Sequence, residues 1–107
     1  MDIKLKRSNK PDKKFMVTID NKTIHFGSKG MKDFTIYSKE NKEEAEKRKK
    51  LYINRHKKRE NWTKSGIKTA GYWSKNLLWS KSTLRESIKA LEKRDNIKIN
   101  NNKNVYY

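Results

Sequence analysis

Apart from its cations, this sequence has few side chains that could do chemistry. The chain has two histidines, twelve acids and no cysteine, and it lacks the HxxxH, HExxH and P-loop spacings that build metal or phosphate sites. His25 alternates with Ile24 and Phe26, which predicts a solvent-facing histidine on a strand. His56 is expected to pack beneath the sheet or to touch phosphate. We therefore expect no enzyme activity and no cofactor, metal or small-molecule ligand.

Basic and aromatic residues, in contrast, are interleaved between positions 47 and 75. Cations gathered on one surface bind phosphates, and aromatic rings among them can stack on bases. Trp62 lies in a polar turn and is expected to be exposed, whereas Trp73 and Trp79 are expected in the core. The candidate nucleic-acid-binding residues are Trp62, for stacking or wedging, and the phosphate contacts Lys47, Arg48, Lys50, Arg55, Lys57, Lys58, Arg59, Lys64, Lys68 and Lys75.

The net charge also points to a polyanionic partner. Lys and Arg number 29 against 12 acids in 107 residues, a formal charge of +17 at pH 7. Such a charge repels itself, and a nucleic acid relieves that repulsion; an anionic membrane surface or an acidic protein is the weaker alternative. Of the 29 cations 23 are Lys, and bidentate reading of guanine favours Arg, so we expect binding with little sequence preference.

The composition limits the size of the fold. Hydrophobic residues make up 32% of the chain and charged residues 38%, which predicts one small domain with a small core. The absence of cysteine excludes disulfides and zinc fingers. Apolar runs reach about three residues, as at 15–17, so no membrane span is expected. The N-terminus lacks a secretory signal pattern, and we expect a protein that is not secreted.

The first part of the sequence predicts a sheet. Residues 1–13 are polar and charged and are expected to form a flexible basic arm. Apolar and polar residues alternate over 15–26, with an interruption at Asp20 and Asn21, and this pattern predicts a β-hairpin. Residues 34–37 are predicted to form a third strand. The glycine-flanked residues 27–30 are expected to form a plain turn rather than a phosphate loop. The expected buried side of this sheet comprises Phe15, Val17, Ile24, Phe26, Phe34 and Ile36.

The remaining sequence predicts helices. Asn41 and Glu44 have the spacing of a capping box, which predicts a helix over 42–59. Thr83 and Glu86 have the same spacing, which predicts a second helix that ends near residue 94. A short helix is expected over 70–79, a last strand over 97–99 and a polar tail over 100–107. The expected fold is α+β over 14–99: a three-stranded antiparallel sheet packed by the long basic helix and two shorter C-terminal helices.

Two motifs, NWTKSG at 61–66 and TAGYW at 69–73, are distinctive. The predicted hairpin sequence upstream of these motifs is similar too. Over about 14–99 the chain therefore resembles an uncharacterised family of small basic proteins of nucleocytoplasmic large DNA viruses. The resemblance implies a viral setting: the virion interior, or the viral factory or nucleus of an infected cell. Large DNA genomes need cationic proteins to neutralise them, so we expect non-specific DNA binding in genome compaction or packaging.

The alternative function is structural. A minor capsid or scaffold component of the virion would act through contacts with other virion proteins. An exposed apolar patch of Trp62, Tyr72 and Trp73 away from the basic face would favour that alternative.

Overall fold

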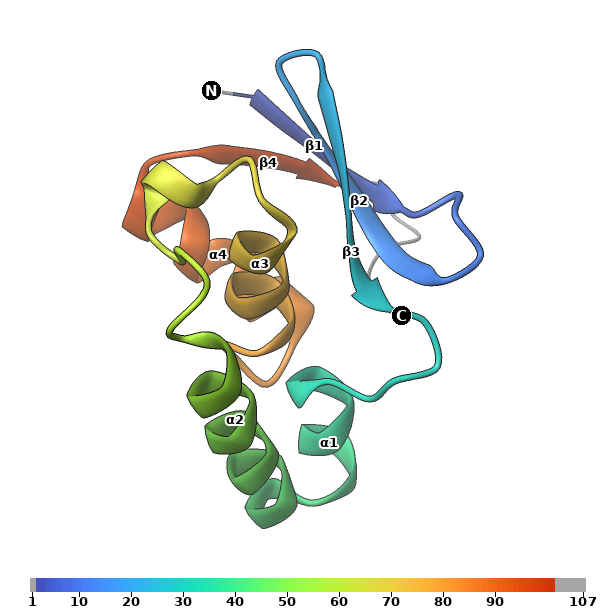
Figure 1. Ribbon diagram of the computed structural model, residues 1–107, viewed down its shortest axis with the longest axis vertical. Helices are drawn as coiled ribbons and strands as arrows, with labels where there is room; N and C mark the ends of the chain where they lie inside the picture. The colour runs from blue at the N-terminus through green and yellow to red at the C-terminus, as the bar shows by residue number, and fades with distance from the viewer. Residues whose placement is uncertain (1, 102–107) are drawn as a thin grey trace.

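A four-stranded mixed sheet forms one end of the molecule (Figure 1). The computed structural model describes residues 2–101. The strands are β1 (Asp2–Arg7), β2 (Lys13–Ile19), β3 (Lys22–Ser28) and β4 (Lys98–Asn101), in the order β3-β2-β1-β4. β2 pairs antiparallel with β1 and β3, whereas β4 runs parallel to β1. The α+β class is therefore confirmed, but the sheet has a fourth, parallel strand.

Strand β1 corrects the prediction of a flexible arm over 1–13. Ile3 and Leu5 alternate with charged residues and are 0% and 1% exposed. β1 is an inner strand, with Ile3 opposite both Ile19 and Ile99. Two apolar residues among many charges are a weak sequence signal, yet burial on one face and hydrogen bonding at both edges are enough to order this segment.

The hairpin predicted over 15–26 is confirmed. β2 and β3 are joined by Asp20 and Asn21, and Asp20 has a φ of +54°, in the left-handed region that Asp tolerates in turns. Gly27 has a φ of +78° and lies one residue before the end of the pairing, where Ser28 is opposite Lys13. A Cβ on Gly27 would lie 2.8 Å from Leu78 Cδ1, so a glycine is needed where β3 meets the helices.

The third strand predicted over 34–37 is wrong, because this segment is the helix α1 (Phe34–Glu40). The buried carboxylate of Asp33 accepts hydrogen bonds from the backbone N–H groups of Thr35 and Ile36, and this cap starts the helix. Lys14 Nζ lies 2.7 Å from the same carboxylate. Phe34 and Ile36 therefore do not belong to the sheet.

Helix α2 (Lys42–His56) begins as predicted, with the Asn41 side chain accepting from the Glu44 N–H. It ends at His56 rather than at 59. Only Ala45 and Tyr52 are buried along it, so its apolar stripe is too narrow to cover a sheet. α2 instead packs against α1, away from the sheet (Figure 1), which corrects the predicted packing of the long basic helix.

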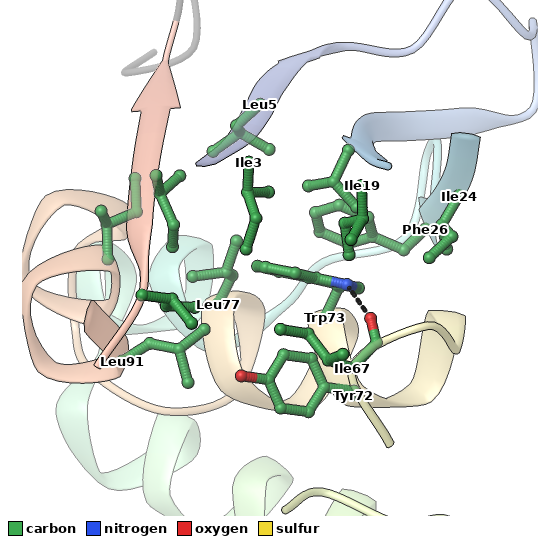
Figure 2. Packing of buried hydrophobic residues seen from close by; sticks show 14 of the residues in the cluster. Ile3, Leu5, Ile19, Ile24, Phe26, Ile67, Tyr72, Trp73, Leu77 and Leu91 are labelled. Atoms are coloured by element: carbon green, nitrogen blue, oxygen red, sulfur yellow. Dashed lines mark hydrogen bonds between the residues drawn. The ribbon is translucent and has the colours of Figure 1, made fainter. Parts of the chain in front are cut away.

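The helices that cover the sheet come from the C-terminal half. The 3₁₀ turn η1 (Lys64–Gly66) leads to α3 (Ala70–Trp73), which continues as the π-helical η2 (Ser74–Leu78). This is the short helix predicted over 70–79. Figure 2 shows Trp73 among the buried side chains of the sheet and helices; its indole N–H donates to the Ile67 carbonyl at 2.7 Å. Trp79 is half-buried and packs against this core.

Helix α4 (Leu84–Asp95) begins as predicted, since the Thr83 hydroxyl caps it by accepting from the Glu86 N–H. The strand predicted over 97–99 is observed as β4. Of the predicted tail, 100–101 belong to β4 and 102–107 lie outside the described residues. No helix within 2–101 has the length and apolar character needed to cross a bilayer.

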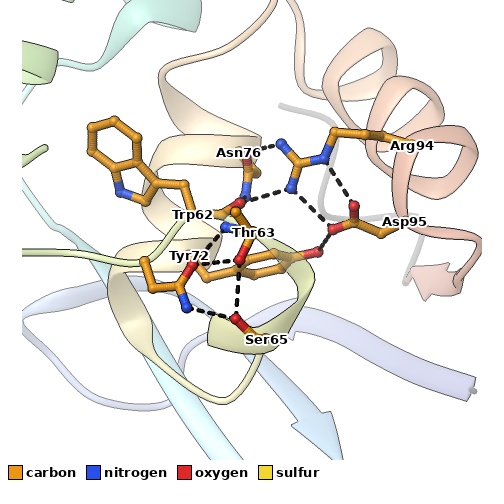
Figure 3. A network of polar contacts seen from close by, with 8 residues as sticks. Trp62, Thr63, Ser65, Tyr72, Asn76, Arg94 and Asp95 are labelled. Carbon is orange, nitrogen blue, oxygen red and sulfur yellow. Dashed lines mark hydrogen bonds and ion pairs between the residues drawn. The ribbon is translucent and has the colours of Figure 1, made fainter.

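A polar network ties α4 to α3 (Figure 3). The Tyr72 hydroxyl donates to the buried carboxylate of Asp95, and Arg94 Nε donates to the same carboxylate at 2.8 Å. Arg94 also donates to the Asn76 amide oxygen at 3.1 Å. The hydrogen bonds from Arg94 and then from Tyr72 hold the pKa of Asp95 below its usual range, although burial acts in the opposite direction.

The placement of β1 predicts the effect of a core substitution. Leu5→Ala should lower the free energy of unfolding by about 2–4 kcal/mol, because it leaves a cavity in a closely packed core. Urea unfolding measures this loss. The control is Lys6→Ala, on the exposed face of the same strand, which should change the free energy of unfolding by less than about 0.5 kcal/mol. Equal, small effects of both substitutions would mean that the segment is a free arm.

The Asp95 network predicts a pH-dependent stability. Asp95→Asn should cost about 1–3 kcal/mol near neutral pH, since it removes a charge-assisted hydrogen bond. The folded-state pKa of Asp95 is lowered, so its stabilisation is present above the ordinary value near 4 and is lost as the pH falls through the folded-state pKa.

The difference in unfolding free energy between the wild type and Asp95→Asn should therefore shrink as the pH falls below about 4. Denaturant unfolding at a series of pH values measures it. Asp20→Asn, at an exposed ion pair with Lys68, is the control and should have little effect at any pH. A difference that stays constant down to low pH would contradict the ion-pair account.

Candidate nucleic-acid interface

The predicted phosphate contacts on α2 lie at its surface. Lys47, Lys50 and Arg55 are exposed. Arg48 is also exposed, but its Nε lies 2.7 Å from the Glu44 carboxylate. The charge of Arg48 is therefore partly balanced within the helix, while the side chains of the other three have no ion pair within residues 2–101.

The cations that follow α2 divide into two sets. Lys57, Lys58 and Arg59 are exposed in the turns after the helix. Lys68 lies beside the turn of the β-hairpin, where its ammonium is 3.2 Å from the Asp20 carboxylate. Lys64, in η1, is close enough to Asp95 to lower the pKa of that carboxyl. The structure thus brings Lys64 near the polar network and leaves Lys68 at the hairpin turn.

Lys75 lies at the centre of a convergence of positive charge. Its ammonium is 5.5 Å from the centre of the Trp62 ring, a cation–π contact. Burial first, and then the charges of Lys49, Arg94 and Lys81, lower the pKa of Lys75. These four cations come from α2, η2, the loop before α4, and α4 itself. We call Lys49, Lys75, Lys81 and Arg94 the Lys75 cluster.

Two members of the Lys75 cluster are fixed by hydrogen bonds. Lys49 Nζ donates to the Ser80 carbonyl at 2.8 Å. Arg94 Nη2 donates to the Trp62 carbonyl at 2.7 Å, and the amide of the buried Asn76 donates to the same carbonyl at 3.1 Å (Figure 3). These bonds hold the cations in place before any ligand arrives, although their mutual repulsion disfavours the arrangement.

Trp62 is half-buried rather than exposed, in contrast to the prediction. Its ring is stacked with that of Tyr52 at 6.5 Å between centres. Its indole N–H donates to Glu60 Oε1 at 2.8 Å, and the other oxygen of Glu60 lies 2.8 Å from His56 Nδ1. His56 stacks on Tyr52, so it belongs to the α2 surface and does not lie beneath the sheet.

Of the residues predicted from the sequence, Lys75 and Trp62 contact each other and Lys64 lies near the Asp95 network, whereas Lys49, Lys81 and Arg94 were not predicted. Lys49 lies in the basic run of α2, but its neighbours there face other directions. Lys81 and Arg94 stand apart in the sequence and reach the cluster only through tertiary packing. No local pattern marks them.

The repulsion within the Lys75 cluster predicts a stabilising substitution. Because the folded-state pKa of Lys75 is lowered, the charged lysine destabilises the folded protein at every pH below that pKa. Lys75→Met keeps the apolar stem and removes the charge, so it should raise the free energy of unfolding by less than about 1 kcal/mol at neutral pH.

Thermal and urea unfolding measure this gain, which should vanish above about pH 10.5, where lysine is uncharged also in the unfolded chain. Lys47→Met, at an exposed position of α2, removes the same charge outside the cluster and serves as control. A loss of stability in Lys75→Met, with Lys47→Met unchanged, would contradict net repulsion.

Comparison with known proteins gives a family but no activity. A family model matches residues 3–56, from β1 to the end of α2. A search of curated proteins and a search of solved structures each gave no match. The match ends before Trp62 and Lys75, so it covers the sheet hairpins and the first two helices. Since it extends over half of the sequence, the chain belongs to a family of unknown function, DUF5754.

Proposed function

We propose that this protein binds nucleic acid, with DNA favoured, through its phosphates and without sequence specificity. The convergence of Lys49, Lys81 and Arg94 around the half-buried Lys75 is the observation that carries the proposal. Gathering like charges raises the free energy of the folded protein, and a polyanion converts that repulsion into attraction. Release of counterions from the phosphates adds to the affinity.

The hydrogen bonds of the Lys75 cluster support this function. Lys49 and Arg94 are already held by Ser80, Trp62 and Asn76, so binding phosphate orders few additional rotamers. The Trp62 ring stacks on Tyr52, and the Lys75 ammonium forms a cation–π contact with the same ring. In this proposal Trp62 positions Lys75, and does not act as a wedge between bases.

Exposed cations near the cluster extend the proposed surface. Arg48 and Lys68 contribute less, because each is already paired with a carboxylate. The excess of Lys over Arg supports contacts with the backbone rather than with base edges. The proposed additional phosphate contacts are Lys47, Lys50, Arg55, Lys57, Lys58, Arg59 and Lys64.

The proposed setting follows from the resemblance to small basic proteins of large DNA viruses. There the protein would compact or package the genome as a non-enzymatic architectural component, in the virion interior or in the viral factory or nucleus of the infected cell. A cationic protein of this size neutralises phosphates along a duplex without reading its bases.

The alternative of a minor capsid or scaffold component has less support from the surface. Its expected aromatic patch needed Tyr72 and Trp73 at the surface, and both are 0% exposed. The large hydrophobic side chains exposed within residues 2–101 are Met31 and Leu51, and isolated apolar residues of this kind are common on monomeric proteins. We therefore favour the nucleic acid over a protein partner.

The proposal predicts a salt-dependent binding curve. Titration of short duplexes of random sequence at several salt concentrations should give a slope of log affinity on log salt of about −4.5 or steeper, which corresponds to five or more phosphates. The double substitution Lys75→Gln, Lys81→Gln should make this slope shallower by about 2 and weaken every sequence alike.

A charge-matched variant makes this test specific. Lys89→Gln, Lys98→Gln removes two exposed lysines from α4 and β4 and should have less effect on the slope. Equal losses in the two double variants would mean that only net charge matters. A much larger loss for one base sequence would contradict binding through the backbone alone, and a stoichiometric protein complex stable at high salt would favour the structural alternative.

A further inference from the structure

A second cationic site lies in a cleft of about 300 Å³. The cleft is bounded by β3, the loop that follows it, the C-terminal part of α2, and α3. Both histidines of the sequence line it. None of the cations of the Lys75 cluster does. The cleft is therefore separate from that cluster, and it shares Arg55 with the wider proposed DNA surface.

The charged lining of the cleft is mainly positive. Lys13, Lys14, Lys32 and Arg55 line it, together with two carboxylates. Asp33, one of these carboxylates, is bound by Lys14. Glu60, the other, is bound through both oxygens, by His56 and by Trp62. The hydrogen bonds to Glu60 leave its charge in place, but the four Lys and Arg side chains outnumber the two carboxylates, so the lining keeps a net positive charge.

Two of the cations are available to a ligand. Lys14 is paired with Asp33, and Lys32 with Glu40 at 2.8 Å. The side chains of Lys13 and Arg55, in contrast, form no ion pair within residues 2–101. A guanidinium and an ammonium beside one cleft are a suitable pair of groups for a phosphate, since the first binds two oxygens at once and the second acts as a point charge.

His56 is oriented towards the same role. Its Nδ1 is held by Glu60, and its ring is stacked on Tyr52 with 4.3 Å between centres. Within the described residues no hydrogen bond occupies its Nε2. The carboxylate at Nδ1 fixes the orientation of the ring, so Nε2 lies on the ring edge away from Glu60.

The rest of the cleft suits a flat apolar group. The accessible apolar part of its lining comes from the half-buried Trp79 and the exposed Met31, with the buried Phe26 and Leu78 behind them. Its volume equals that of roughly ten water molecules at about 30 Å³ each, more than a bare phosphate fills. Clefts that combine an apolar wall with a few convergent polar groups are the usual form of small-ligand sites.

We propose that this cleft binds a phosphate-bearing nucleotide, with the phosphate at Lys13 and Arg55, beside His56, and the base against Trp79 and Met31. Two sources share this chemistry: a free mononucleotide, or the phosphorylated end of a strand whose backbone lies on the Lys75 cluster. Glu60 connects the two sites, because it holds both His56 in the cleft and Trp62 beneath Lys75. The site goes beyond the proposed function and does not depend on it.

Titration with the four ribonucleoside 5′-monophosphates, monitored by the NMR signals of the His56 ring and the Trp79 indole, tests this proposal. At about 0.15 M salt, where exposed charges are screened, at least one nucleotide should shift both signals with saturation. The corresponding nucleoside and inorganic phosphate should each bind at least about tenfold more weakly, because each supplies one half of the recognition.

Matched variants distinguish the cleft from general attraction to a basic protein. Arg55→Gln should weaken nucleotide binding about tenfold, whereas Lys89→Gln, an equal loss of charge on α4 outside the cleft, should not. Both positions are exposed, so both variants should keep the wild-type unfolding temperature. The proposal is overturned if no nucleotide shifts the two signals, if phosphate alone binds as well, or if the two variants behave alike.

A second comparison identifies the source of the nucleotide. Tighter binding of a 5′-phosphorylated single strand than of the same strand without the phosphate, lost in Arg55→Gln, assigns the cleft to strand ends. Equal binding of the two strands, with mononucleotides still bound, assigns it to free nucleotides. Lys75→Gln, Lys81→Gln should retain the mononucleotide in either case, so failure of the duplex-binding proposal would be seen separately.

Discussion

The indole of Trp73 joins the sheet to the helices, and the short helix that carries it also places Lys75. The ring is fully buried, 6.3 Å from the Phe26 ring on β3, and its N–H is satisfied by the Ile67 carbonyl. With only 32% hydrophobic residues, the chain has few other large side chains to fill this layer (Figure 2). A large ring with its polar atom paired can anchor such a small core at little polar cost.

The same short helix that buries Trp73 carries the centre of the proposed interface. Lys75 follows two residues later, and a helical turn therefore points it away from the core and towards Trp62. Asn76 and Arg94 then connect the helix to α4 and to the Trp62 carbonyl. Core packing and cation placement are thus parts of one arrangement, which explains how a lysine with a lowered pKa persists in a small, highly charged protein.

Local signals predicted much of this structure, and tertiary contacts explain the rest. Both helix N-caps and the hairpin turn follow from spacing within a few residues, and the burial of Trp73 follows from the need of a core-poor chain for large apolar side chains. The residue types at 34–37 favour a strand, and only the N-cap at Asp33 indicates a helix. Strand β1 is hard to predict because its charged residues outnumber Ile3 and Leu5. Lys81 and Arg94 join the candidate interface only through folding, so a search for clusters along the sequence does not find them.

The central claim is that the Lys75 cluster binds a polyanion, and the ionisation of Lys75 tests it most directly. NMR titration of the labelled lysine side chains should give Lys75 a pKa below the ordinary lysine value in the free protein, for the burial and repulsion described above. With a saturating GC-rich duplex, the phosphates should raise that pKa, because they favour the charged form. A Lys75 pKa that is unchanged by saturating duplex would contradict the account.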